Sequence, residues 1–154
     1  MKRMMELWML IAVFSIVSCG NEDVHATEPT VDTTHRLRVV IGSQTITTTL
    51  YDNPTTRDFI SRLPMTVDLS DYGGTEKVFT PSPELKTVGS PSGVNPKAGD
   101  IALFAPWGNI AIYYKNGTSS GSLISIGRVE NGINALAVSG NIKDVRFELT
   151  DVEH

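Results

Sequence analysis

The amino-acid sequence predicts a mainly β domain, folded as a closed barrel or as a sandwich, with two short helices. Three observations support this fold class. From Arg36 onward, apolar residues alternate with polar ones over many short segments, a period typical of strands with one buried face. Turn-forming residues separate these segments at regular intervals. Only two short stretches favour helix, residues 54–63 and a part of residues 131–139, so strands make up most of the domain.

The first 18 residues resemble a bacterial lipoprotein signal peptide. Two basic residues precede an apolar run over residues 7–17, which is too short to span a bilayer as a mature helix. The run ends in Ser18-Cys19, similar to the lipobox, in which the signal is cut before a cysteine that carries lipid. We therefore expect residues 1–18 to be removed and Cys19 to be lipidated. The alternative is an ordinary secretory signal with a coincidental cysteine.

Residues 19–35 are polar and show no apolar period, which predicts a flexible tether between the lipid and a domain over residues 36–150. Gly20, rather than an aspartate, follows the cysteine. By resemblance to Gram-negative lipoproteins, this indicates a bacterial cell envelope protein held at the outer membrane. Glu22 and Asp23 resemble the surface-export signals of some of these lipoproteins, or they only solvate the tether.

Composition excludes several function classes. The chain has 13 basic and 17 acidic residues and a formal net charge of −4. It therefore has no basic stripe that would bind nucleic acid or make a second, polybasic contact with the membrane. Cys19 is the single cysteine, and the three histidines stand at positions 25, 35 and 154. Because these positions lie in the tether or at the edges of the domain, we predict no metal site, no catalytic triad and no cofactor.

The elements of the domain are predicted in order along the chain. A hairpin with its turn at Gly42-Ser43 comes first. A short helix follows over residues 54–63, with Asn53 as its N-cap and Pro64 ending it. Four prolines make residues 81–99 an irregular surface loop. The remaining predictions are strands over residues 65–72, 76–80, 101–105, 109–115, 123–129 and 142–149, and a helix within residues 131–139.

Four segments of the domain form a recognisable set: YGGTEKVF from Tyr72, AGDIALFAPWGN from Ala98, IAIYY from Ile110 and SLISIGRVENGINAL from Ser122. Together they resemble a bacterial family of cyclophilin-like domains. The resemblance covers residues 36–150. It implies a closed eight-stranded barrel with helices at its ends.

The residues that true cyclophilins use for prolyl isomerisation are not matched. In those enzymes an arginine on the strand after the first helix lies beside the bound proline, among phenylalanine, glutamine, tryptophan and histidine. Here residues 65–71 hold no arginine and no aromatic residue, and residues 116–122 hold neither tryptophan nor histidine. Isomerisation crosses a barrier of roughly 20 kcal/mol, and the resemblance implies that the arginine lowers it by hydrogen bonding to the prolyl nitrogen. Because this arginine has no counterpart here, no catalytic residue is predicted and an enzyme is not expected.

Five residues are candidates for binding a ligand. Trp107, in a turn, is either a stacking platform or a tryptophan that folds back over the barrel end. Glu76 is either a pocket carboxylate or a solvated charge at a strand end. Tyr72 and Asn109 flank these two in the family segments. Tyr114 is the fifth candidate; it and its neighbour Tyr113 point to opposite faces of their strand, one into the barrel and one out. We expect these side chains to form one site at an end of the barrel.

The leading hypothesis is therefore a lipid-anchored binding module for a small molecule or a peptide, with the membrane as its other partner through Cys19. One alternative is a weak prolyl isomerase of the cell envelope. Another is a structural accessory lipoprotein without a ligand. An open cleft with a buried carboxylate favours the first hypothesis, whereas a barrel filled by side chains favours the structural role.

Overall fold

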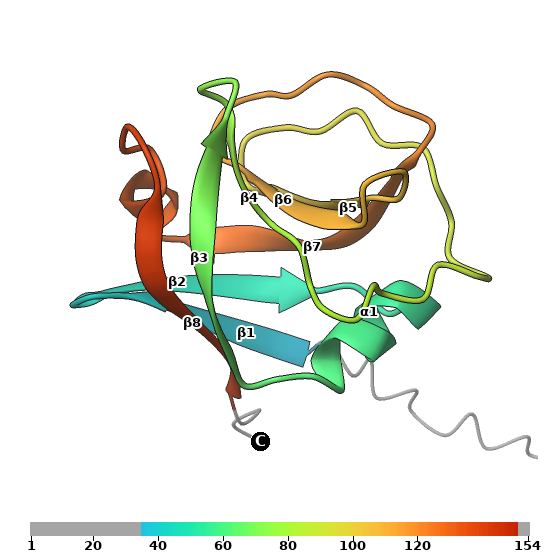
Figure 1. Ribbon diagram of the computed structural model, residues 1–154, viewed down its shortest axis with the longest axis horizontal. Coiled ribbons are helices and arrows are strands. Elements are labelled where there is room, and N and C mark those ends of the chain that lie inside the picture. The colour runs from blue at the N-terminus through green and yellow to red at the C-terminus, as the bar shows by residue number, and fades with distance from the viewer. Residues whose placement is uncertain (1–34, 151–154) are drawn as a thin grey trace, which may run out of the picture. The chain divides into compact units, whose positions relative to one another are not determined.

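Eight antiparallel strands close into a barrel in residues 35–150, the part of the chain that the computed structural model describes (Figure 1). The order around the barrel is β1-β2-β7-β5-β6-β4-β3-β8, and β8 pairs with β1 to close it. The predicted closed eight-stranded barrel is confirmed. Its strands are β1 His35–Ile41, β2 Gln44–Leu50, β3 Met65–Tyr72, β4 Glu76–Phe79, β5 Asp100–Phe104, β6 Asn109–Tyr113, β7 Leu123–Asn131 and β8 Ile142–Thr150.

The expected signal peptide, the tether and Cys19 lie outside the described residues. Within residues 35–150, no helix has the length and apolar character that crossing a bilayer requires.

The first hairpin forms as its sequence predicts. β1 and β2 pair from His35 with Leu50 to Ile41 with Gln44, which leaves a two-residue turn. Gly42 occupies this turn with a φ of 57°, a conformation that glycine adopts without steric cost. The alternating apolar residues of both strands point into the barrel, where they are buried.

The helix α1 (Pro54–Ile60) begins where the sequence predicts and ends three residues earlier than expected. The Asn53 side chain accepts a hydrogen bond of 2.9 Å from the Thr56 backbone N–H, and Pro54 occupies the first turn. The side chain of Phe59 packs in the barrel core, with its ring edge-on to Phe147 and the ring centroids 6.4 Å apart. The helix therefore anchors the chain between β2 and β3.

The second short helix, predicted within residues 131–139, is a three-residue 3-10 helix, η1 (Ile133–Ala135). Its backbone makes i to i+3 hydrogen bonds from the N–H groups of Ala135, Leu136 and Ala137, and glycines with positive φ stand before it at Gly132 and after it at Gly140, so the helix is limited to about one turn.

Lys77 lies inside one end of the barrel and is 0% exposed. Its ammonium donates to Asp71 Oδ1 at 2.7 Å and to the carbonyls of Val138 and Gly140 at 2.6 Å each. Tyr114 stands beside it, with its hydroxyl 2.7 Å from Asp71 Oδ1 and the ammonium 5.3 Å from its ring centroid. All three ammonium protons thus have acceptors, as a buried cation requires.

The central strand β6 is buried along its whole length. Ile110 and Ile112 belong to the core inside the barrel. Ala111 and Tyr113 point the other way, into a second apolar cluster with Ala102 and Leu123. Because side chains alternate along a strand, this second cluster lies on the outer face of the barrel wall. Something must therefore cover β5 and β6 from outside.

Candidate functional site

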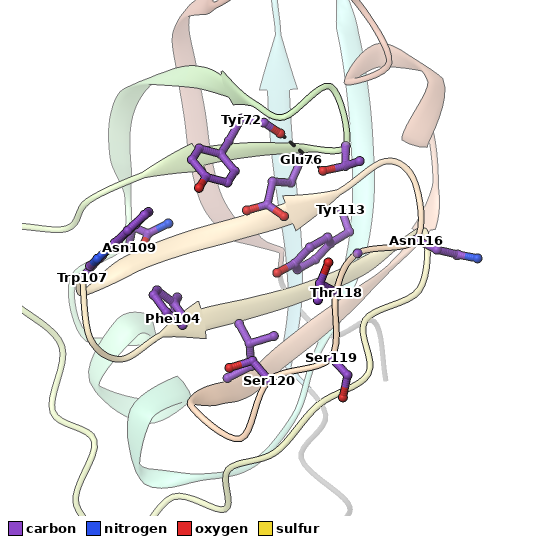
Figure 2. A pocket seen from close by; sticks show the side chains of 13 residues that line it. Tyr72, Glu76, Phe104, Trp107, Asn109, Tyr113, Asn116, Thr118, Ser119 and Ser120 are labelled. Atoms are coloured by element: carbon purple, nitrogen blue, oxygen red, sulfur yellow. Dashed lines mark hydrogen bonds between the residues drawn. The ribbon is translucent and has the colours of Figure 1, made fainter.

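A cavity of about 440 Å³ lies on this outer face. Figure 2 shows its side chains standing on β3, β4, β5 and β6 and on the loop that follows β6. Its size falls within the range of small-molecule sites. The lining consists of Tyr72, Thr75, Glu76, Phe104, Trp107, Asn109, Tyr113, Asn116, Gly117, Thr118, Ser119, Ser120 and Leu123.

The site was expected at an open end of the barrel, whereas this cavity lies on the outer face of the barrel wall. Ile110 and Ile112 fill the interior with the other core residues, which leaves the cavity to Asn109 and Tyr113 on the opposite face of the same strand. The alternation along β6 thus directs polar groups outward. The barrel itself is a packed scaffold, and the cavity is built on its wall.

Two loops cover this part of the wall. Gly117 lies so close to Tyr113 that a Cβ placed on it would stand 2.3 Å from ring atom Cε1. The Gly117 N–H donates to the Pro96 carbonyl at 3.0 Å. Val94 and Ser120 form a bridge with N···O distances of 3.1 and 3.0 Å. The loop over residues 114–122 is therefore held in place by the loop over residues 81–99.

Glu76 and Tyr113 form the polar floor at one end of the cavity. They stand directly opposite each other on β4 and β6. Burial raises the pKa of the Glu76 carboxyl, although a hydrogen bond from Tyr113 acts in the other direction. Burial, together with the Glu76 carboxylate, raises the pKa of Tyr113 to about 12. Glu76 forms no salt bridge with any residue in the range 35–150.

Aromatic rings form a wall of the cavity. Trp107 meets Tyr72 edge-on with centroids 6.0 Å apart, and it meets Phe104 edge-on at 5.4 Å. Trp107 nevertheless remains 60% exposed, so it does not fold back into the barrel end. Edge-to-face packing holds the indole in position while much of its surface stays open to a ligand.

Asn109 supplies an unused acceptor. Asn109 as a whole is 9% exposed, and its side-chain Oδ1 is buried without any hydrogen-bond partner among the described residues. A buried carbonyl oxygen without a donor costs about 1–3 kcal/mol. Because such groups are rare in folded proteins, each one calls for a physical explanation. A ligand donor reaching into the cavity provides one.

Four of the five predicted residues, Tyr72, Glu76, Trp107 and Asn109, line the cavity together. Tyr114 does not line it, because its side chain bonds to Asp71 beside the buried Lys77. Its neighbour Tyr113 takes that place, since the two side chains point to opposite faces. We therefore replace Tyr114 with Tyr113 in the candidate site.

Sequence reasoning did not identify Phe104 or the hydroxyl residues Thr118, Ser119 and Ser120. One available signal was the sequence of β6, NIAIY, which is almost continuously apolar. Such a run indicates a strand buried on both faces, and it implies a covering loop. The identity of that loop depends on long-range packing, which the local pattern does not encode.

The chemistry of the lining limits what the cavity can do. It contains aromatic rings, one carboxylate, two amides and several hydroxyls, but no lysine, arginine or histidine. Within residues 35–150, no group of three or more histidine, aspartate, glutamate or cysteine side chains is arranged to hold a metal ion. The lining is therefore suited to binding through acceptors and aromatic faces.

Comparison with known proteins supports the fold. Residues 39–148 match the Cyclophilin-like family. The barrel is also similar to the solution structure of a hypothetical protein from Archaeoglobus fulgidus, with a TM-score of 0.59 and 21% sequence identity. That similarity covers 75% of this chain and 94% of the other. The chain matches no curated protein. Since the family match spans most of the chain, this protein belongs to the Cyclophilin-like family.

Proposed function

We propose that this protein is a lipid-anchored component of a bacterial cell envelope whose barrel binds a small molecule or a peptide in the outer-face cavity. The observation that carries the binding proposal is the unpartnered Oδ1 of Asn109, a residue of the cavity lining. With the Asn109 side chain turned toward the cavity, a ligand N–H or O–H satisfies this acceptor, so that binding removes the cost of leaving it buried and alone. The open face of Trp107 supplies apolar contact area.

Trp107→Ala tests the binding proposal. The variant is expected to weaken ligand binding by about 2 kcal/mol or more, or roughly 30-fold, as for other central aromatic contacts. Its thermal unfolding midpoint is expected to stay within a few degrees of the wild type, because the indole is 60% exposed. Calorimetric screening of a library of small molecules and short peptides against both proteins measures the first effect, and circular dichroism measures the second.

Tyr51→Ala is the control, since Tyr51 is an exposed aromatic residue outside the cavity lining. Phe79→Ala would not serve, because Phe79 is part of the core. The Tyr51→Ala control is expected to keep full binding. Unfolding of the Trp107→Ala variant would mean that the tryptophan is structural, and equal binding by wild type and variant would remove it from the site.

The lipid anchor is proposed from the signal sequence that ends in Ser18-Cys19. Metabolic labelling with a fatty-acid analogue is expected to mark the wild type and not the Cys19→Ala variant. Separation of inner and outer membranes is expected to place the labelled protein in the outer membrane. Equal labelling of the two proteins contradicts the anchor, and recovery from the inner membrane alone contradicts the location.

A further inference from the structure

The acceptors of the cavity have no cationic partner among residues 35–150. Glu76 forms no salt bridge with another described residue, and no lysine or arginine of the described range lines the cavity. The nearest residue in sequence that carries a positive charge, Lys77, points into the barrel and is bound by Asp71. A partly buried carboxylate is thus left to be neutralised by something from outside.

A second acceptor stands at the other end of the same strand. Asn109 and Tyr113 are the first and last residues of β6, which places their Cα atoms about 13 Å apart. Glu76 is opposite Tyr113. The unpartnered oxygen of Asn109 and the carboxylate of Glu76 therefore belong to opposite ends of an elongated site.

Aromatic faces lie along this site. Trp107 packs against both Tyr72 and Phe104, and Figure 2 shows Tyr72, Glu76 and Tyr113 grouped over the strands with Trp107 and Asn109 to one side. Aromatic faces carry negative electrostatic potential and attract ammonium groups and the methylene carbons next to them. The aromatic wall therefore attracts positively charged ligands, as the Glu76 carboxylate does.

We infer that the cavity binds an elongated organic amine, with one ammonium group at Glu76 and a second N–H group at Asn109 Oδ1. The aliphatic part of such a ligand packs against Trp107 and its neighbouring rings. This inference rests on the proposed binding function and specifies the ligand class for that same cavity. Anionic ligands are disfavoured, since the cavity would place their charge beside a carboxylate without an intervening cation.

Hexamethylenediamine is a direct probe of this inference. Its six-carbon chain, with a hydrogen bond at each end, has a length comparable to the separation of the two acceptors. Hexamethylene glycol is the matched neutral probe, because it has the same chain and terminal hydroxyls in place of ammonium groups. Titration calorimetry on the full-length protein in detergent is expected to detect the diamine and not the glycol.

Glu76→Gln identifies the carboxylate. This variant is expected to bind the diamine about 30-fold more weakly, because it removes one member of a buried charge pair. Glu130→Gln is the matched control: it removes the same charge from the end of β7, outside the cavity lining, and is expected to bind normally. Glu76→Gln is also expected to fold, since burial disfavours the charged carboxyl that the substitution removes.

The possible outcomes separate the ligand class from the proposed function. Diamine binding that is lost in Glu76→Gln and kept in Glu130→Gln supports both. Equal binding of diamine and glycol, or equal loss in the two variants, overturns the amine inference. If neither probe binds but a neutral or acidic compound from the screening library binds and is lost in Trp107→Ala, the amine inference falls and the binding function stands. If no compound binds, both fall.

Discussion

Lys77→Met is expected to lower the free energy of unfolding by about 3 kcal/mol, although methionine fits the space of the lysine chain. The substitution leaves the Asp71 carboxylate and the carbonyls of Val138 and Gly140 without their common donor. Breaking a buried ion pair by removing one partner costs about 3–5 kcal/mol, and a value near the lower end is expected because Asp71 is partly exposed. Denaturant unfolding followed by circular dichroism measures the change.

Lys143→Met is the matched control for this prediction. Lys143 also pairs with an aspartate, Asp68, but both side chains are well exposed. Exposed ion pairs contribute about 0–1 kcal/mol, so this control is expected to unfold almost as the wild type does. Similar losses in the two variants would mean that burial of Lys77 adds nothing to the value of its contacts.

The effect of Lys77→Met is also expected to depend on pH. Hydrogen bonds from Lys77 and then from Tyr114 lower the pKa of Asp71 below its ordinary value of 3.8. A lowered native pKa stabilises the fold above the unfolded-state value, and this stabilisation is lost as the pH falls through the native value. The difference in stability between wild type and variant is therefore expected to shrink below about pH 4.

Phe147→Ala is expected to have the largest effect on stability among these substitutions, about 3–5 kcal/mol. Phe147 is 1% exposed and contacts two other rings, Phe59 from α1 at 6.4 Å and Phe79 from β4 at 5.1 Å between centroids. Its removal leaves a cavity where the helix meets the barrel. Denaturant unfolding measures the loss.

Leu149→Ala is the control on the same strand. Leu149 lies two residues further along β8 and is 41% exposed, so its truncation is expected to cost less than about 1 kcal/mol. A loss for Phe147→Ala no larger than for Leu149→Ala would mean that the core collapses around the missing ring at little cost.

Local patterns were sufficient to predict most of the barrel. Alternation in β1 and β2, and the asparagine and proline that begin α1, are short-range features whose physical effects depend on neighbouring residues alone. Closure of the barrel came from the family resemblance instead, because alternation alone also fitted a sandwich. The second helix is shorter than its segment because glycines with positive φ stand on both sides of it, at Gly132 and Gly140.

The candidate site was predicted in part for the same reason. Turn glycines and aromatic residues marked Tyr72, Glu76, Trp107 and Asn109, and the structure places these residues around one cavity. Local sequence did not decide whether Tyr113 or Tyr114 faces outward, since alternation gives two opposite faces without saying which is which. It also did not show which loop covers β6, because that depends on the contacts between residues 94 and 120.

Closure of the barrel has a consequence for how a peptide ligand is recognised. Each strand has a hydrogen-bonded neighbour on both sides, so the sheet has no free edge onto which a peptide adds as an extra strand. Main-chain pairing, which is largely indifferent to sequence, is therefore not a source of affinity here. Selectivity must come from side chains of the ligand, and substitutions in the covering loops are able to change it while the barrel stays the same.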